Sequence, residues 1–326
     1  MILEIKDLTV KFKGMRGTVE ALKNVSFSIG KGEILGVVGE SGSGKSVTAL
    51  SVLGLLEKNA MITSGEILYA GRNLITLDKK ERQNIRGKQI GMVFQEPMTA
   101  LHPTMKVGKQ LAEVIKRHRG VSKKEAYQLA VKAFEEVHIH EPHLVADKYP
   151  FELSGGMRQR VVIALAMAAP PDLLIADEPT TALDVTIQYE ILKLMKELSE
   201  KRGTSVLLIT HDLGVVSEIC QRVVVMYAGE VIEMGKTESV LRAPKHPYTK
   251  ALLHALPDLA DPDEPLHAIP GEVPDLRNRP IGCAFASRCD RVMGICHEKP
   301  PVMNVVQERH AVSCWAAEQD GGDSID

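Results

Sequence analysis

The most constraining feature of this 326-residue chain is a five-residue segment, Leu153–Met157, with the sequence Leu-Ser-Gly-Gly-Met. The segment becomes informative because two other motifs accompany it in the sequence. A phosphate-loop sequence, Gly-Glu-Ser-Gly-Ser-Gly-Lys-Ser, stands upstream at Gly39–Ser46. An acidic motif, Leu-Leu-Ile-Ala-Asp-Glu, stands just downstream at Leu173–Glu178. Any one of these segments arises by chance, but the three in this order are very hard to attribute to chance. The chain therefore has to fold around a nucleotide site.

Apolar runs with strand character alternate with helical patterns through most of the chain. We predict strands over Leu3–Val10, Leu22–Ile29, Ile34–Val38, Glu66–Tyr69, Leu173–Ala176, Ser205–Thr210 and Val223–Tyr227. We predict helices over Lys45–Leu56, Lys106–His118, Lys123–Val137 and Val185–Lys201, and turns at Lys31–Gly32 and Thr63–Gly65. This alternation indicates an α/β fold with a parallel sheet covered by helices on both faces. A helical stretch over residues 97–169 interrupts it.

Charge and apolar content exclude several classes of function. The formal net charge of −2 gives no bulk electrostatic reason to expect a nucleic-acid partner. The longest apolar run, Val161–Ala169, is too short to cross a bilayer. The N-terminus lacks the charged-then-apolar layout of a signal peptide. We therefore expect a cytoplasmic chain that contacts a membrane only through partners.

The phosphate loop follows an apolar strand and opens a helix, which is the context that this motif requires. Its glycines let backbone N–H groups turn inward around phosphates, and the helix N-terminus adds a favourable dipole. Lys45 would supply a positive charge to the β- and γ-phosphates of ATP, and Ser46 a hydroxyl to Mg²⁺. The matching positions argue against a ligand-free Gly/Ser-rich loop. The residues predicted to bind ATP here are Gly39, Ser41, Gly42, Gly44, Lys45, Ser46 and Val47.

Two acids end the strand predicted at Leu173–Ala176. Asp177 is placed to reach Mg²⁺ through a water molecule, and Glu178 follows it directly. An Asp-Glu pair on an ordinary loop after a strand is the alternative, which the phosphate loop makes the weaker one.

Taken together, the three motifs resemble the ATP-binding cassette family, the ATPase subunits of ABC transporters. The resemblance implies that Glu178 is the general base that polarises the attacking water. Gln95, in Val93–Pro97, matches the Q-loop of the family and would contact Mg²⁺ and that water. His211, in Leu208–Asp212, matches the H-loop histidine, which would bind the γ-phosphate and orient Glu178.

The resemblance also assigns residues that act on the ATP of an opposite subunit. Ser154, Gly155 and Gly156 would press against the γ-phosphate held there, and Asp184, in the D-loop at Ala182–Asp184, also crosses to the partner. Small residues at a helix start allow close approach and offer N–H donors. Phe12, near the end of the first strand, is the best candidate to stack on adenine, although a single Phe is equally compatible with a core position.

Four segments resemble one branch of the family, the ATPase subunits of oligopeptide and dipeptide importers, and the D-type of their two subunits in particular. They are Phe94–Pro103, Ala176–Val185, His246–Lys250 and Gly282–Cys289. The resemblance implies a RecA-like P-loop sheet with an antiparallel β subdomain, a helical insert and a small Cys-rich C-terminal appendage. The corresponding domains are a nucleotide-binding domain over 1–256, with its helical subdomain at 97–169, and an importer-type C-terminal domain over 257–326.

The same resemblance implies partners. They are a second ATPase subunit of the F-type or a second copy of this chain, two transmembrane permease subunits, and an extracytoplasmic peptide-binding protein that acts through the permease. The chain would lie on the cytoplasmic face of the cell membrane, with ATP and Mg²⁺ bound. Other cargoes of related importers remain open: nickel chelates, glutathione or oligosaccharides. A soluble ABC ATPase of DNA repair or translation lacks support, because the chain has neither long coiled coils nor a second cassette. His246–Tyr248 and the C-terminal cysteines argue against an exporter cassette.

Four of the five cysteines fall in the proline-interrupted C-terminal part, at Cys283, Cys289, Cys296 and Cys314. Their C-x5-C-x6-C-x17-C spacing is wider than the closely spaced pair that opens most structural zinc sites. Four thiolates suit a [4Fe–4S] cluster, which the resemblance favours. Zinc and unmetallated buried thiols remain alternatives, whereas disulfides do not suit a cytosolic chain. We expect Cys220, which stands alone on a predicted helix, only to pack in the core.

Overall fold

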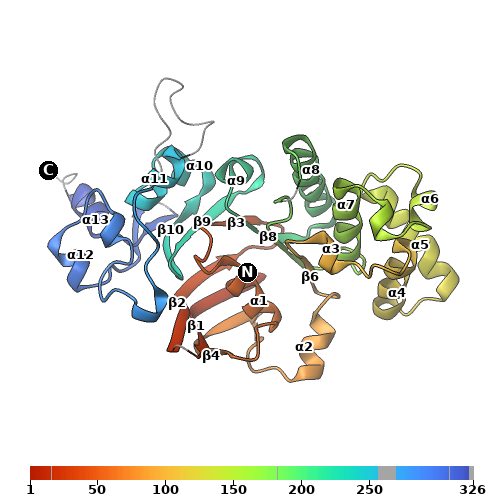
Figure 1. Ribbon diagram of the computed structural model, residues 1–326, viewed down its shortest axis with the longest axis horizontal. Helices are drawn as coiled ribbons and strands as arrows, with labels where there is room; N and C mark the ends of the chain where they lie inside the picture. Colours follow the sequence, from red (N-terminus) through yellow and green to blue (C-terminus); the bar gives the residue numbers. More distant parts are fainter. Residues whose placement is uncertain (16, 182, 256–268, 308, 323–326) are drawn as a thin grey trace. The chain divides into compact units, whose positions relative to one another are not determined.

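The computed structural model describes residues 1–15, 17–181, 183–255, 269–307 and 309–322 (Figure 1). Contacts divide the chain into two compact units. Unit 1 consists of residues 1–2, 29–34 and 76–209, and unit 2 of residues 3–28, 35–75 and 210–326. Each unit is therefore assembled from segments that lie far apart in the sequence.

The sheet of unit 1 contains three parallel strands. Strand β6 (Ile90–Val93) pairs with β7 (Leu173–Asp177), and β7 pairs with β8 (Ser205–Thr210). Every residue of β7 and β8 is buried. Strands covered on both faces need apolar side chains on both sides, which explains their continuous apolar runs. The carboxyl ends of these strands lie at one edge, so the residues that follow β6 and β7 come together.

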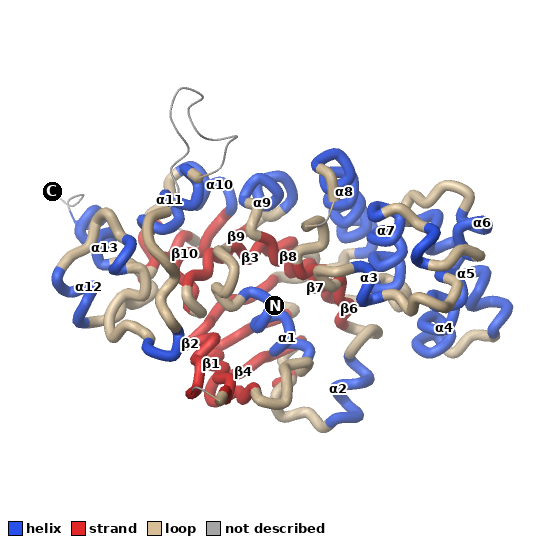
Figure 2. The backbone as a smooth tube through the Cα atoms, viewed as in Figure 1, coloured by secondary structure: helices blue, strands red, loops and turns tan. Residues whose placement is uncertain are grey.

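Helices make up most of unit 1. They are α2 (Lys79–Ile85), α3 (Pro97–Ala100), α4 (Val107–Arg119), α5 (Lys123–Glu136), α6 (Pro142–Ala146), the 3-10 turn η1 (Pro150–Glu152), α7 (Gly155–Ala166) and α8 (Val185–Arg202). The segment from α3 to α7 lies between β6 and β7 in the chain, although these two strands are direct neighbours. Within it, α4, α5 and α6 pack on one another (Figure 2). The predicted helical stretch is thus an insertion between adjacent strands.

Unit 2 contains the strands of two sheets. The first is antiparallel where its pairing is resolved and has the order β2-β1-β4-β5, with β1 at Leu3–Gly14, β2 at Gly17–Ile29, β4 at Ala60–Tyr69 and β5 at Arg72–Asn73. In the second, β3 (Ile34–Val38) pairs in parallel with β9 (Arg222–Tyr227). Antiparallel pairing then continues through β10 (Glu230–Lys236), β12 (His310–Val312) and β11 (Asn304–Gln307). The α/β class and the antiparallel part agree with the sequence prediction.

The helices of unit 2 are short. They are α1 (Lys45–Leu53), α9 (Leu213–Ile219), α10 (Thr237–Arg242), α11 (Pro247–His254), the 3-10 turns η2 (Leu276–Asn278) and η3 (Ala286–Arg288), α12 (Gly294–Glu298) and α13 (Trp315–Gly322). Helix α1 ends at Leu53 and not at Leu56, because Gly54 adopts a left-handed conformation with φ 59° and closes the helix.

The turn expected at Thr63–Gly65 is wrong, because β4 runs straight through it and pairs with β1. Gly65 has φ 95°, and a Cβ there would lie 2.5 Å from the Asp7 carbonyl oxygen. The pairing register shifts between Lys6 and Thr9, opposite this glycine. The glycine therefore serves a local irregularity in the sheet, not a chain reversal.

The described C-terminal residues are not a separate appendage, which corrects the sequence expectation. Strand β12 extends the sheet of unit 2, with Glu233 opposite Val312 and Met234 opposite Ala311. A small apolar cluster lies beyond it, made of Val312, Cys314, Ala316 and Ala317 with Met293 and Val306 packed against it. No local sequence pattern encodes this pairing.

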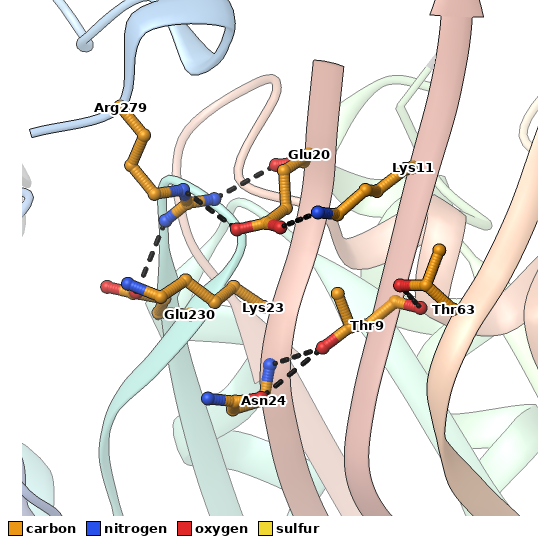
Figure 3. Close-up of polar contacts among 8 residues, drawn as sticks. All are labelled: Thr9, Lys11, Glu20, Lys23, Asn24, Thr63, Glu230 and Arg279. Carbon is orange, nitrogen blue, oxygen red and sulfur yellow. Dashed lines mark hydrogen bonds and ion pairs between the residues drawn. The ribbon is translucent and has the colours of Figure 1, made fainter. Parts of the chain in front are cut away.

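Arg279 anchors the same region at a second point (Figure 3). Its Nη2 donates to the Glu20 carbonyl oxygen at 2.9 Å, and its guanidinium forms ion pairs with the carboxylates of Glu20 and Glu230 at 3.7 and 3.3 Å. Lys23 also pairs with Glu230, at 2.9 Å. Residue Ala182 of the D-loop and the predicted domain boundary at 256/257 lie outside the described residues, so the division into domains stays a prediction.

Among the described residues, no helix combines the length and the apolar character that crossing a membrane requires.

Candidate functional site

The phosphate loop connects the buried strand β3 to helix α1 in unit 2. A Cβ on Gly39 would clash with the Met226 carbonyl oxygen, and one on Gly44 would lie 2.6 Å from Leu22 Cδ2. Both glycines also have positive φ, 154° and 100°. The loop path that the motif predicts therefore depends on glycine at these two positions.

Lys45 is held inside the loop that it belongs to. Its side chain is 5% exposed, and its ammonium donates to the carbonyl oxygens of Gly39 at 2.7 Å and Glu40 at 3.0 Å. Helix α1 has no acidic residue in its first turn and no side chain capping its N-terminus. A helix N-terminus offers backbone N–H groups and the positive end of the helix dipole to an anion, and no acidic side chain of this first turn opposes that. Ser46 and Val47 lie half-buried in this turn, while Ser41 and Gly42 are exposed.

The acidic motif ends strand β7 in unit 1. Asp177 is buried, and Glu178 is half-buried. Glu178 has φ 46°, a left-handed conformation that costs a non-glycine residue about 1–3 kcal/mol. Its amide donates to the Ile209 carbonyl oxygen at 2.9 Å, two residues before His211 in the chain. The backbone thus holds Glu178 in an unfavourable conformation at the edge of the sheet.

Two predicted catalytic residues meet at this edge. Gln95 Nε2 donates to Glu178 Oε2 at 3.1 Å. Thr181 Oγ1 donates to the same oxygen at 2.9 Å. Sequence reasoning missed Thr181, although a hydroxyl three residues after Glu178 in the same turn is a signal for such a bond. Two donors on one oxygen fix the orientation of the carboxylate.

His211 follows β8 and is exposed, and it belongs to unit 2. The next residue, Asp212, caps helix α9 by accepting from the amides of Gly214 at 2.8 Å and Val215 at 3.3 Å. The Asp212 amide donates to Thr210 Oγ1 at 3.0 Å. His211 is therefore flanked by two residues with fixed hydrogen bonds.

Two exposed helix N-termini carry the residues predicted to act on a partner's ATP. Ser154 caps α7 by accepting from the Met157 amide at 3.3 Å, and Asp184 caps α8 by accepting from the Ile187 amide at 3.0 Å. A Cβ on Gly156 would lie 2.8 Å from Ile187 Cγ2, so glycine allows α7 to approach α8. Gly155 is exposed, and Gly156 is half-buried. Ser154 and Asp184 thus have a structural role whatever else they do.

Phe12 is half-buried on β1, opposite Ala60, and is not part of the buried core. Its position leaves part of the ring accessible. Stacking on adenine stays a prediction.

The four C-terminal cysteines are free thiols that lie in unit 2. The pKa of Cys283 is raised to about 12, mainly by burial, with smaller contributions from the nearby thiols of Cys296, Cys314 and Cys289. The Cys283 amide donates to the Cys296 carbonyl oxygen at 2.8 Å. The sulfurs of Cys289, Cys296 and Cys314 therefore lie close enough to Cys283 to influence its ionisation.

Even so, in the part of the chain that the structure describes, no group of three or more His, Cys, Asp or Glu side chains has the arrangement of a metal-ion site. Cys220 is a separate case. It is buried at the C-terminal end of α9, and burial raises its pKa to about 12. A Cβ on Gly36 would lie 3.1 Å from its sulfur, which is consistent with a packing role.

Two family models match the sequence. One, described as ABC transporter, matches residues 22–181, which include the phosphate loop, Gln95, the Ser154 segment and Glu178. The other, described as Oligopeptide/dipeptide transporter, C-terminal region, matches residues 232–296.

Curated proteins match over almost the whole chain. The oligopeptide transport ATP-binding protein OppD of Bacillus subtilis (strain 168) is 51% identical over 321 residues, which are 98% of this chain and 90% of the relative. The probable peptide ABC transporter ATP-binding protein y4tR of Sinorhizobium fredii is 48% identical over 98% of this chain and 96% of its own length. A solved dimeric structure of a post-hydrolysis state of an ATP-binding cassette, bound to ADP and Pi, matches with a TM-score of 0.65 and 32% identity. The match covers 72% of this chain and 98% of that one.

Proposed function

The chain belongs to the peptide ABC transporter ATP-binding proteins, and from this premise we propose that it binds and hydrolyses ATP to drive the import of di- or oligopeptides. The match of residues 232–296 to the C-terminal region of oligopeptide and dipeptide transporters carries the proposal. A nucleotide cassette alone does not specify a cargo, whereas the model that matches this region is described by oligopeptide and dipeptide transport.

In the proposed site, the amides of Gly39–Ser46 and the charge of Lys45 bind the phosphates of ATP. Ser46, Asp177 and Gln95 are the residues that would bind Mg²⁺. Bound Mg²⁺ would neutralise charge that develops on the phosphate oxygens. Phe12 stacks on the adenine. The capless N-terminus of α1 and the buried Lys45 support this assignment.

Glu178 acts as the general base that takes a proton from the attacking water. The bonds from Gln95 and Thr181 to Oε2 support the assignment, because they fix the carboxylate before the reaction begins. His211 binds the γ-phosphate and orients Glu178. Phosphoryl transfer depends mainly on positioning and electrostatic stabilisation, which such a preorganised set of polar groups supplies.

A second ATPase subunit completes the site. Ser154, Gly155, Gly156 and Asp184 contact the ATP that this subunit holds, and the partner is an F-type subunit or a second copy of the chain. Their places at the exposed starts of α7 and α8 support an interface role. The similar cassette solved as a dimer supports pairing.

The membrane partners are two permease subunits, which receive peptide from an extracytoplasmic binding protein. The chain lies on the cytoplasmic face of the membrane. Four large apolar side chains in or beside the helical insert remain exposed among the described residues, Phe94 at 39%, Met98 at 48%, Leu144 at 59% and Phe151 at 65%, which supports a docking role for that region.

If the C-terminal cysteines bind a [4Fe–4S] cluster, Cys283, Cys289, Cys296 and Cys314 would be its ligands. The influence of Cys289, Cys296 and Cys314 on the Cys283 thiol supports the grouping. Anaerobically purified protein should contain about four irons per chain, and replacing any one of the four by Ser should remove the cluster's absorbance. If the purified protein contains stoichiometric zinc and no iron, the site is a zinc site and not a cluster. If the folded protein contains no metal, the four cysteines are ordinary thiols.

The full complex tests the proposed function. The chain, its cognate permeases and binding protein are reconstituted in liposomes, and ATP turnover and uptake are measured with peptides of two to five residues. We expect peptide to stimulate both, and Lys45→Ala to abolish both. If only a nickel chelate, glutathione or an oligosaccharide stimulates turnover and uptake, the proposed cargo is wrong and that compound is the cargo. Turnover indifferent to the permease would exclude a transport role. Ser154→Arg in one subunit should silence the opposite site while the altered chain still binds ATP.

A further inference from the structure

The phosphate loop is held from outside by residues near the C-terminus of unit 2. The carboxylate of Glu40, the second loop residue, accepts two hydrogen bonds from Arg288, Nη1 to Oε2 at 2.9 Å and Nη2 to Oε1 at 3.1 Å. The Glu40 amide donates to the hydroxyl of Tyr248 at 2.9 Å. Both the side chain and the backbone of Glu40 are thus fixed by residues more than 200 positions away in the sequence.

Arg288 is itself rigidly placed. Its side chain is 5% exposed, its Nε donates to the Pro270 carbonyl oxygen at 2.8 Å, and its Nη1 also contacts the Tyr227 hydroxyl at 3.2 Å. The guanidinium lies 5.7 Å from the ring centre of Tyr227 and 5.9 Å from that of Phe285. The bond to Glu40 raises the pKa of Arg288, so the cation is permanent. Such a packed, bidentate pair has one geometry.

Glu40 is in turn connected to the lysine that binds phosphate. Its carbonyl oxygen accepts from Lys45 Nζ at 3.0 Å and from the Ser43 amide at 3.2 Å. A displaced Glu40 would therefore move an acceptor of the Lys45 ammonium and one turn of the loop. A continuous chain of contacts runs from Arg288 through Glu40 to Lys45.

We propose that Arg288 is a positioning residue for the phosphate loop and that its bidentate bond to Glu40 sets the affinity of the chain for ATP. This rests on the proposed function, in which Gly39–Ser46 binds ATP. Arg288 ends the turn η3, whose Ala286 amide donates to the Cys283 carbonyl oxygen at 3.1 Å and whose Ala286 carbonyl accepts from the Cys289 amide at 3.4 Å. The segment Cys283–Cys289, which contains two of the four cysteines, therefore supports the phosphate loop through Arg288.

The experiment measures the Kd for MgATP by titration calorimetry on the full-length chain. We compare wild type with Arg288→Gln, Glu40→Gln, the double variant and Arg288→Lys. Each single Gln variant should bind ATP about tenfold more weakly, the equivalent of one charge-assisted hydrogen bond. The double variant should be no weaker than either single one, because both remove the same contact. Arg288→Lys should be intermediate, since an ammonium does not reproduce the bidentate fork.

Arg202→Gln is the matched control. Arg202, in unit 1, pairs with Glu136 and donates to the Met167 carbonyl oxygen at 2.8 Å, so its loss should lower the Tm and leave the Kd for ATP within about twofold. Circular dichroism confirms folding, and Glu40→Gln tests the contact from the loop if Arg288→Gln does not fold. An unchanged Kd for ATP in Glu40→Gln, or fully additive losses of affinity in the double variant, would overturn this inference and leave the proposed function standing. A wild-type chain that binds no ATP would overturn the proposed function and the inference with it.

Discussion

Unit 1 and unit 2 each contain a glutamate that accepts several hydrogen bonds. The two glutamates differ in their burial and in the groups that donate to them. Glu178 is half-buried, has a left-handed backbone, and accepts from the side chains of Gln95 and Thr181. Glu233, on β10, is 0% exposed. It accepts from two backbone amides, of Lys245 at 2.7 Å and His246 at 3.0 Å, and from His310 Nε2 at 2.7 Å.

The difference separates a residue that we propose acts in catalysis, Glu178, from a residue that joins segments of the fold, Glu233. Glu178 lies at a sheet edge that water reaches, in a conformation that the fold holds at a cost. Glu233 joins β10 to the start of α11, 12–13 residues further along the chain, and to β12, 77 residues away. Burial alone would raise the pKa of Glu233, but the hydrogen bonds from His310 and the two amides outweigh it and lower the pKa. The buried carboxylate is thus ionised and satisfied by its partners.

The largest effect is expected from Glu178→Gln. The amide keeps the shape of the side chain and removes the base, so ATP turnover in the assembled complex should fall by about 10²–10⁴. ATP binding and the Tm should change little. Glu200→Gln, an exposed glutamate on α8, is the control and should change neither turnover nor Tm. Turnover of Glu178→Gln within twofold of wild type would remove the general base from the proposal.

The sequence predicted the site's components better than their contacts. Strands Ile34–Val38 and Ser205–Thr210 have the predicted bounds, because each is a short apolar run between polar or glycine residues. The bond between Gln95 and Glu178 depends on the pairing of β6 with β7, and β6 was not among the predicted strands. The bonds of Glu40 to Arg288 and of Glu233 to His310 join residues 248 and 77 positions apart, and nothing local marks them.

Glu233→Gln tests the architectural side of the comparison. A neutral amide cannot accept from both amides and His310 as the carboxylate does, so unfolding free energy should fall by about 3 kcal/mol. Urea unfolding measures the loss. Under conditions where the variant remains folded, its Kd for ATP should stay closer to wild type than that of Arg288→Gln. A stability loss below about 0.5 kcal/mol, typical of surface changes, would show that Glu233 is not a structural centre.

The contribution of Glu233 to stability should also depend on pH. The folded-state pKa of Glu233 is lowered from its ordinary value of 4.5, so its contribution is fully present above pH 4.5 and is lost as the pH falls through the folded-state value. The stability gap between wild type and Glu233→Gln should therefore be constant near neutral pH and narrow on acidification below 4.5. Urea unfolding of both proteins at several pH values measures this gap. A gap that widens in acid would contradict the lowered pKa.

Asp184→Ala tests a residue that belongs to both sides of the comparison, and its effect on turnover should be far smaller than that of Glu178→Gln. Its carboxylate caps α8 through the Ile187 amide, and losing an N-cap costs about 1 kcal/mol. Asp78 caps α2 in the same way, accepting from the Glu81 amide at 2.7 Å, so Asp78→Ala is a matched loss in unit 1.

If Asp184 also contacts a partner's nucleotide, the two variants should be destabilised alike but differ in turnover. Asp184→Ala should turn over ATP about fivefold more slowly in the assembled pair, the equivalent of one hydrogen bond of about 1 kcal/mol, while Asp78→Ala retains wild-type turnover. The isolated chain separates the two roles, because it has no opposite subunit and its ATP affinity should be the same in both variants. If Asp184→Ala and Asp78→Ala turn over ATP equally fast in the assembled pair, Asp184 is only a helix cap. The catalytic residues of unit 1 would then be limited to the sheet edge that carries Gln95 and Glu178.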